Sequence, residues 1–297
     1  MMETIWIALT GSPGSGKAEI FDALIGNRSR VPAEKKIGRV SHNGYDVEIV
    51  DLPETCSLTA YSAGEIIVRD FILDETPDVV VQVVDAANLE RSLYLTTRLV
   101  ELGAPVIIAL NMAGARADVI DSERLSAFLE IPVVCTARTR GDGREDLLDA
   151  AIREVETAPC HERIMDYVDY GAEVETMIAS LIDLLLTDRT LTVRYPLRWL
   201  AVRLLEGDED ALARIPCGLA FNRLQDFLSL VDSDEYRAAM VERRYEAIAA
   251  ILPQVLSPGP GCCGGAGGRV VVEYVLTGKG RLAAERLTGM GHHLGLN

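Results

Sequence analysis

Residues 4–18 read TIWIALTGSPGSGKA, a short apolar run that ends in a glycine-rich turn. Gly11, Gly16 and Lys17 have the spacing of the Walker A phosphate loop, and they directly follow an expected strand, Ile5–Thr10. Glycines let backbone N–H groups curl around a phosphate, the lysine adds a positive charge, and the next helix presents its positive end. The stretch predicts a strand, a phosphate loop and a helix; the alternative is a tight turn that binds nothing.

Apolar runs and amphipathic segments alternate through residues 1–157, which is typical of a parallel sheet with helices on both faces. This α/β fold class places ligand chemistry at the carboxyl ends of the strands. The other expected strands are Tyr45–Asp51, Val79–Asp85, Pro105–Asn111 and Ile131–Thr136. The expected helices are Ala18–Ile25, Ala63–Leu73, Leu89–Leu102, Ser122–Leu129 and Asp142–Glu156.

A small all-helical domain is expected over 158–256, because the strand signal ends near Tyr170 and apolar residues then recur at three- and four-residue spacing. Its expected helices cover 174–185, 196–206 and 219–231, and a longer one follows a capping box formed by Asp232 and Glu235. Amphipathic helices place arginine and tryptophan at the border between core and solvent. We interpret Arg198, Trp199 and Arg203 in this way.

The C-terminal region has a different composition. The stretch SPGPGCCGGAGG at 257–268 predicts a flexible linker. The tail over 269–297 contains RVVVEYVLTGKGRLAAERL, which predicts one strand, a turn and a short helix. That order is similar to the wing and last helix of winged-helix proteins, but it lacks a recognition helix, so we favour a docked or mobile tail.

Composition limits the classes of partner. The 297 residues include 45 Asp and Glu against 29 Lys and Arg, a net charge of −16 that repels nucleic acid and anionic lipid. No apolar run approaches the roughly 20 residues that cross a bilayer, and the start MMETIW does not resemble a signal peptide. Six cysteines without CxxC spacing indicate reduced thiols. We expect a cytoplasmic protein with no membrane span.

Two longer stretches carry a resemblance. DLPETCSLTAYSAGE at 51–65 and PDVVVQVVDAANLERSLYLTTRLVELGAPVIIALNM at 77–112 resemble the cytoplasmic G domain of the ferrous iron transport protein B (FeoB) family. YGAEVE at 170–175, PLRWLAVRLLEGD at 196–208 and RRYEAI at 243–248 resemble the helical domain that follows it. The resemblance covers residues 4–256 and implies a P-loop G-domain fold, a GTP or GDP ligand and a link to Fe²⁺ uptake.

The resemblance also implies which residues contact a nucleotide. They come from the phosphate loop, from a DLPE motif, from an NMAG base-recognition motif and from a CTAR motif that closes over the base. Asp51 is implied as an indirect anchor for magnesium. The implied contacts are Gly11, Ser12, Pro13, Gly14, Ser15, Gly16, Lys17, Ala18, Asp51, Leu52, Pro53, Glu54, Asn111, Met112, Thr136 and Ala137.

Several positions depart from the family pattern. Ala18 replaces the threonine that is a magnesium ligand, and Gly14 replaces an asparagine that coordinates potassium. Glu54 replaces a glycine whose N–H meets the γ-phosphate, and Gly114 replaces the aspartate that recognises guanine. The first switch, NRSRVPAE at 27–34, is short and has no threonine. Phosphoryl transfer depends on metal-assisted positioning, so these losses predict weakened nucleotide binding and deficient hydrolysis.

The sequence leaves three functions open. The one that we favour is a regulatory module that binds GTP or GDP and acts in ferrous iron uptake through a protein partner, such as a full-length FeoB-type transporter at the inner membrane. The second is a slow GTPase that a partner completes, with magnesium held by Asp51 through water. The third is a scaffold that binds no nucleotide.

Cysteine and histidine pairs suggest little further chemistry. We expect Cys135, which precedes Thr136, to be a buried strand residue rather than a reactive thiol. The pairs Cys160–His161, Cys262–Cys263 and His292–His293 lack the spacing of metal ligands, so we interpret them as solvated loop and tail residues.

Overall fold

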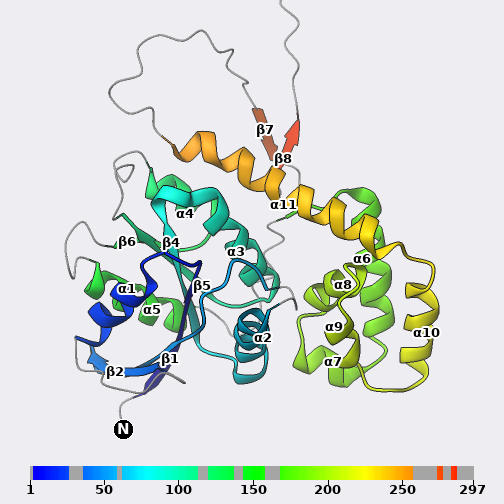
Figure 1. The fold of residues 1–297 in the computed structure, drawn as a ribbon, viewed down its shortest axis with the longest axis horizontal. Coiled ribbons are helices and arrows are strands. Elements are labelled where there is room, and N and C mark those ends of the chain that lie inside the picture. Colours follow the sequence, from blue (N-terminus) through cyan, green and yellow to red (C-terminus); the bar gives the residue numbers. More distant parts are fainter. Residues whose placement is uncertain are drawn as a thin grey trace, which may run out of the picture. The chain divides into compact units, whose positions relative to one another are not determined.

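The computed structural model describes residues 3–26, 36–58, 62–112, 120–136, 143–157, 168–256, 273–276 and 282–285 (Figure 1). The chain forms two compact units, Met1–Ser257 and Pro258–Asn297. The strands of the first unit are β1 (Thr4–Gly11), β2 (Lys36–His42), β3 (Tyr45–Asp51), β4 (Val79–Asp85), β5 (Val106–Asn111) and β6 (Val133–Thr136).

Helices of the first unit cover the sheet and then continue beyond it. The helices that alternate with strands are α1 (Lys17–Ile25), α2 (Ala63–Asp70), the π-helical η1 (Phe71–Glu75), the 3₁₀ turn η2 (Ala86–Asn88), α3 (Leu89–Glu101), α4 (Ser122–Leu129) and α5 (Arg144–Thr157). The helices that follow are α6 (Ala172–Leu185), α7 (Arg189–Arg194), α8 (Leu197–Leu205), α9 (Glu209–Ala213), α10 (Leu219–Leu228) and α11 (Ser233–Val255).

The described strands of the first unit form one six-stranded sheet in the order β2-β3-β1-β4-β5-β6. All neighbours are parallel except β2, which pairs antiparallel with β3. The predicted α/β class is therefore confirmed. Strand β2 was not predicted from the sequence. It is an edge strand, with β3 as its one partner in the described sheet. Its signal was the Asn43-Gly44 dipeptide, whose positive φ angles of 47° and 86° make the hairpin turn into β3.

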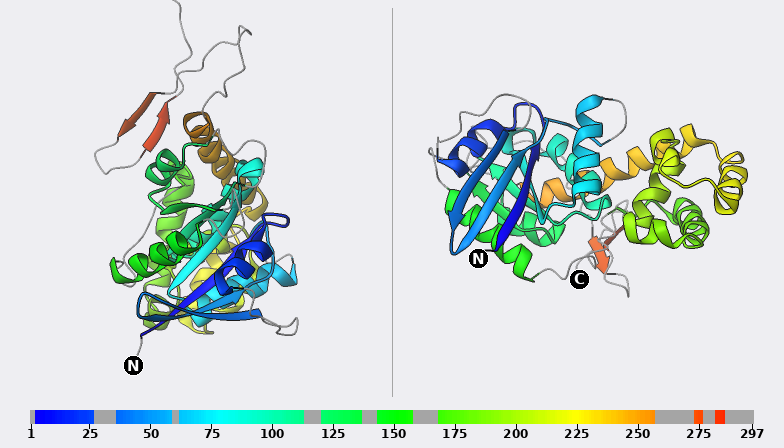
Figure 2. Two further views of the ribbon diagram at one scale, coloured as in Figure 1. Left: turned by 90° about the vertical axis from the view of Figure 1, so that its left-hand side faces the viewer. Right: turned by 90° about the horizontal axis from the view of Figure 1, so that it is seen from below.

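Alternation along the strands divides the core between two faces of the sheet. Val79, Val81 and Val83 of β4 belong to the cluster packed under α1 and α5. Val80 and Val84 point the other way, into the cluster formed with α2, α3 and α4. Figure 2 shows helices on both sides of the sheet. Successive side chains of a strand face opposite ways, so a strand that is buried on both faces is apolar throughout.

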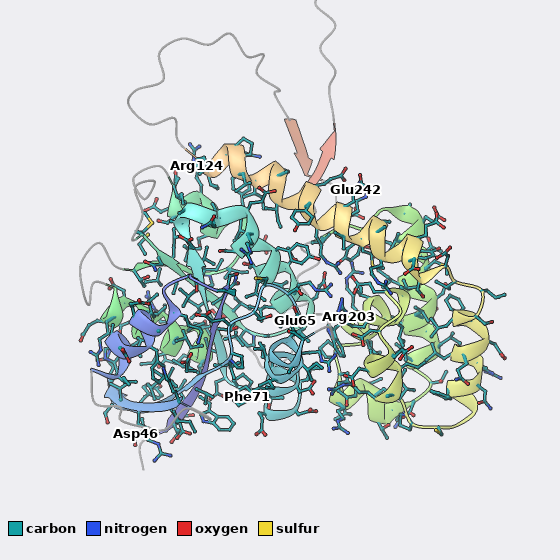
Figure 3. The ribbon with its side chains drawn as sticks, in the orientation of Figure 1. Asp46, Glu65, Phe71, Arg124, Arg203 and Glu242 are labelled. Carbon is teal, nitrogen blue, oxygen red and sulfur yellow. The ribbon has the colours of Figure 1, made fainter. Side chains whose placement is uncertain are left out.

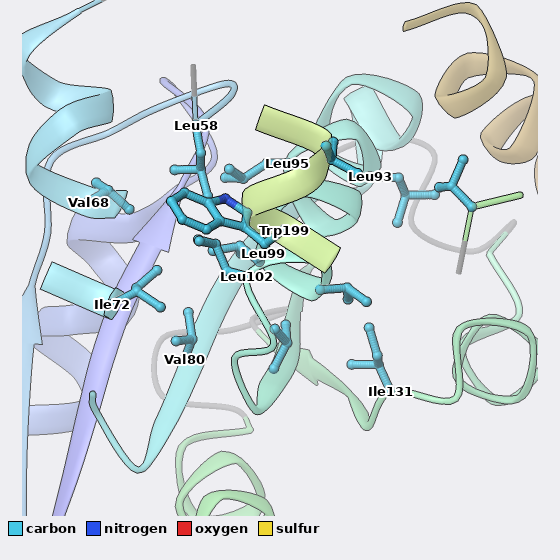
Figure 4. Close-up of a cluster of buried hydrophobic side chains, with 14 of the residues drawn as sticks. Leu58, Val68, Ile72, Val80, Leu93, Leu95, Leu99, Leu102, Ile131 and Trp199 are labelled. Carbon is cyan, nitrogen blue, oxygen red and sulfur yellow. The ribbon is translucent and has the colours of Figure 1, made fainter. Parts of the chain in front are cut away.

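The cluster formed with α2, α3 and α4 continues without a break into the helices after the sheet. Trp199 of α8 is 2% exposed and belongs to the same cluster as Leu58, Leu95 and Leu99. Figure 4 shows its indole among these side chains, with Val68 on α2 nearby. The helices of 172–256 therefore pack on the sheet-bearing part through shared apolar side chains.

Buried charges lie at the same junction. Arg244 of α11 contacts Glu101 at the end of α3 at 2.8 Å and Glu206 after α8 at 2.7 Å. Arg98 contacts both carboxylates, and Arg203 contacts Glu206. Burial alone would raise the pKa of Glu101, but the guanidinium groups of Arg244 and Arg98 outweigh it and lower that pKa. Arg203, expected at the border with solvent, is 2% exposed because Glu206 pairs with it inside.

The second unit contains a short antiparallel pair, β7 (Glu273–Leu276) and β8 (Leu282–Glu285). The short helix expected in this tail is therefore wrong over 282–285. Leu-Ala-Ala-Glu has helical propensity, but antiparallel pairing with β7 overrides such a weak preference. Within the described residues, no helix is long and apolar enough to cross a membrane.

Candidate functional site

The carboxyl ends of the parallel strands β1, β3, β4, β5 and β6 lie along one edge of the sheet. In the strand order, β1 lies between β3 and β4. The chain leaves β1 for α1 on one face and leaves β3 for α2 on the other face. Ligands of open α/β sheets bind where the connections diverge in this way. The loop between Gly11 and Lys17 lies at this position.

The backbone of this loop depends on glycine. The Ser15 N–H donates to the Ser12 carbonyl at 3.0 Å, which closes a turn. Gly14 and Gly16 have φ of 77° and 84°, a region that favours glycine. A Cβ at Gly16 would lie 2.1 Å from Nδ2 of Asn111, whereas a Cβ at Gly14 would meet nothing within 4 Å. Position 16 therefore requires glycine both for its backbone conformation and for the space that Asn111 occupies, whereas position 14 requires it for its conformation alone.

Asn111 fastens the loop to the neighbouring strand end. Its Nδ2 donates to the Ser15 carbonyl at 2.7 Å. Asn111 pairs in register with Thr136 of β6, and the Met112 N–H donates to the Thr136 carbonyl at 3.0 Å. The predicted base-side residues thus lie beside the predicted phosphate loop, although they are about 100 residues away in the chain.

Buried hydroxyl groups lie within the loop and directly before it. Thr10, Ser12 and Ser15 are at most 4% exposed. Their hydroxyl oxygens have no hydrogen-bond partner among the described residues. Buried polar groups are ordinarily paired, and hydroxyls can donate to an anion. The two hydroxyls within the loop, those of Ser12 and Ser15, therefore fit a ligand with several acceptor oxygens, such as a diphosphate.

The one lysine of the loop is already paired. Nζ of Lys17, which is 5% exposed, forms an ion pair with Oδ1 of Asp51 at the end of β3. The Asp51 side chain is 9% exposed. The structure thus brings together two predicted site residues, and it does so by direct contact between opposite charges.

The segment after Asp51 runs alongside β1. The Leu52 N–H donates to the Leu9 carbonyl at 2.9 Å, and the Thr55 N–H donates to the Gly11 carbonyl at 3.0 Å. Pro53 is half-buried and Glu54 is exposed. The predicted DLPE contacts therefore lie next to the start of the phosphate loop.

The same segment touches the helical part of the chain, a link that the sequence did not indicate. Ser57 Oγ donates to Glu65 of α2 at 3.0 Å, and Nη1 of Arg203 donates to the Leu58 carbonyl at 3.3 Å. Figure 3 labels Glu65 and Arg203 near this junction. Cys56 also accepts from Nη2 of Arg91 at 3.0 Å. No local pattern marks the contact between Arg203 and Leu58, because the two residues are 145 positions apart in the chain.

Other predictions have mixed outcomes. Cys135 lies in β6 as expected, but it is exposed rather than buried, because β6 is an edge strand with β5 as its one neighbour in the sheet. Ala137 and Gly114 lie outside the described residues, as does the short switch at 27–34. Cys160–His161 and the pairs near the C-terminus lie outside them too.

The residues present do not fit magnesium. The cation takes oxygen ligands in near-octahedral geometry. Ala18, which follows Lys17 at the exposed start of α1, has only a methyl side chain and therefore provides no oxygen ligand. The Asp51 carboxylate is held by Lys17. In the described ranges, no three His, Cys, Asp or Glu side chains are grouped so that they could hold a metal ion.

Comparison with protein families assigns two matches. Residues 5–151 match the model described as ferrous iron transport protein B, and residues 170–257 match the FeoB cytosolic helical domain. A Porphyromonas gingivalis protein named as a fusion of Fe(2+) transport protein A and Fe(2+) transporter FeoB is 37% identical over 84% of this chain. The Fe(2+) transporter FeoB of Escherichia coli K12 is 37% identical over 86% of it. This chain spans about a third of these relatives, 32% and 34% of their lengths.

Solved structures agree along nearly the same length. The cytosolic domain of the T. maritima FeoB iron transporter in its GMPPNP form is 30% identical with a TM-score of 0.72, covering 86% of this chain and 100% of that one. The mGMPPNP-bound NFeoB of S. thermophilus is 30% identical with a TM-score of 0.69, covering 85% and 98%. The fold over this length is therefore shared with the cytosolic domains of such transporters.

Proposed function

Because the chain belongs to the ferrous iron transport protein B family, we propose that it is a guanine-nucleotide-binding regulatory module that serves ferrous iron uptake. One observation carries the proposal. The loop between β1 and α1 has its glycines in left-handed conformations, its buried hydroxyls unpartnered and its buried Lys17 at the end. The two solved relatives described above are named as GMPPNP forms, which supports a guanine nucleotide as the ligand.

The proposed ligand contacts divide between phosphates and base. The loop residues from Gly11 to Ala18 would hold the phosphates, with Lys17 as the positive charge. Leu52, Pro53 and Glu54 would border the terminal phosphate. Asn111, Met112, Thr136 and Ala137 would border the base and ribose. The first three of these last four lie together at the ends of β5 and β6.

We propose further that the module hydrolyses nucleotide poorly. A bound metal ion ordinarily supplies charge stabilisation for phosphoryl transfer. Ala18 offers no hydroxyl to such an ion, and Glu54 adds a negative charge beside a terminal phosphate. Gly114 offers no carboxylate to guanine. Regulation would then depend on nucleotide occupancy rather than on turnover.

The proposed partner is a membrane protein of the same transport system. The relatives are named as Fe(2+) transporters, and this chain matches a family model and a solved structure that are described as cytosolic domains. A module of this kind would act from the cytoplasmic side on a transporter, such as a full-length FeoB-type protein. No direct contact with iron is required by this proposal.

The test is a titration of fluorescent GDP, GTP and ATP analogues, combined with phosphate release. We expect weak binding of the guanine nucleotides, with Kd of roughly 10–1,000 μM, because several contacts worth ~1–3 kcal/mol each are missing. Lys17→Ala should abolish this binding. Arg39→Ala is the matched control, since Arg39 is an exposed cation on β2. It should bind like the parent.

The outcomes separate the three functions. Tight guanine-selective binding with Mg²⁺-dependent turnover would establish the slow GTPase instead. Absence of binding at millimolar nucleotide would establish the scaffold. Equal binding by the parent and Lys17→Ala would place the nucleotide elsewhere.

A further inference from the structure

Lys17 and Asp51 form a pair that is closed off from solvent. Both side chains are less than 10% exposed, and Nζ contacts Oδ1 directly. A lysine in a phosphate loop attracts phosphate through its charge, and a carboxylate in contact with it cancels most of that charge at a distance. The pair is therefore close to neutral as seen by an approaching anion.

The surroundings explain why Asp51 is free to make this contact. Ala18 carries no oxygen that would bring a divalent cation to the loop, so the Asp51 carboxylate has no cation other than Lys17 within the described site. Burying a carboxylate without a partner is strongly unfavourable. The cost is offset when Asp51 takes the neighbouring ammonium group.

We propose that Asp51 is an internal counter-ion that competes with the nucleotide phosphates for Lys17, so that this loop binds nucleotide without magnesium. The inference rests on the proposed function and adds to it the roles of Asp51 and of the metal. A phosphate that takes over the contact of Lys17 with Asp51 leaves two like charges close together. Magnesium does not relieve this repulsion, because Ala18 offers it no ligand.

The role of Asp51 predicts an unusual mutational effect. In Asp51→Asn the competing charge is gone while the side-chain shape is kept. We expect GDP affinity to rise about tenfold, since a charge-assisted contact of Lys17 becomes available to phosphate. If Asp51 instead served as a metal anchor, the same substitution would weaken binding in MgCl₂.

The experiment titrates a fluorescent GDP analogue into the full chain and into Asp51→Asn, each in millimolar MgCl₂ and in EDTA. The parent should bind equally in both, within about twofold, because Mg²⁺ gains no protein ligand. Asp46→Asn is the control. Asp46 is an exposed carboxylate on the same strand, and it accepts a hydrogen bond from Ser41 Oγ at 3.0 Å. The GDP affinity of Asp46→Asn should match that of the parent, which excludes the change of net charge as the cause of tighter binding by Asp51→Asn.

The results distinguish this inference from the proposed function. If the parent fails to bind but Asp51→Asn binds, the counter-ion role holds and the proposed function of the parent fails. If the parent binds and Asp51→Asn binds more weakly, the inference is wrong while the function stands. If neither binds, both are wrong. Should Asp51→Asn not fold, the parent still decides: binding that is more than tenfold tighter in MgCl₂ than in EDTA overturns the inference.

Discussion

Gly16 illustrates how much of the site depends on single residues. Its φ of 84° disfavours any side chain, and the space where a Cβ would lie is filled by Nδ2 of Asn111. That same Nδ2 donates to the Ser15 carbonyl. A side chain at position 16 is therefore disfavoured by the backbone conformation, and it would also collide with Asn111 and disturb the hydrogen bond from Asn111 to Ser15.

A pair of glycine substitutions separates these effects. Gly14→Ala should lower the free energy of unfolding by about 1 kcal/mol, because the only penalty there is the positive φ. Gly16→Ala should cost about 1–3 kcal/mol more, since it also displaces Asn111 and breaks the bond to Ser15. Urea denaturation followed by circular dichroism measures both. Equal losses in the two variants would contradict the role assigned to Asn111.

Helix α11 shows how one element joins two parts of the chain. Its buried Arg244 contacts Glu101 of α3 and Glu206 after α8. Arg243, which precedes Arg244 in the sequence, faces solvent and contacts Glu246 about one turn further along the helix. The helix therefore carries two arginines, adjacent in sequence, that differ in burial and in the distance along the chain to their partners.

This contrast gives a stability prediction for α11. Arg244→Met should cost about 3–5 kcal/mol, because it leaves two buried carboxylates short of a cation. Arg243→Met should cost less than about 0.5 kcal/mol, as an exposed ion pair contributes little. Thermal and urea unfolding of both variants provide the measurement. A small loss in Arg244→Met would show that Arg98 and Arg203 neutralise the cluster without it.

At the scale of the whole first unit, one of the two core clusters joins the sheet-bearing part to the helices that follow it. Apolar side chains of α2 and α3 belong to one cluster with those of α6, α8 and α11. The chain has two tryptophans, Trp6 on β1 and Trp199 on α8. The two parts of the unit therefore each carry one fluorescent reporter.

These reporters test whether the two parts unfold together. Trp6→Phe leaves Trp199 as the one tryptophan to be excited selectively, and Trp199→Phe leaves Trp6. We expect fluorescence and far-UV circular dichroism to give the same urea midpoint within each variant, because a shared core makes unfolding cooperative. Separate midpoints within one variant would mean that 1–157 and 158–256 are independent domains.

Sequence alone predicted the central strands, the helices between them and the phosphate loop, because periodicity and glycine spacing act between residues a few positions apart. The family resemblance added the base-side residues Asn111 and Thr136. Only the tertiary structure decided that Asp51 pairs with Lys17, that Arg203 is buried and that Cys135 is exposed. The Asp51 pair depends on two strand ends that are far apart in the sequence, the burial of Arg203 depends on how other segments pack over it and Glu206, and the exposure of Cys135 depends on the edge position of β6.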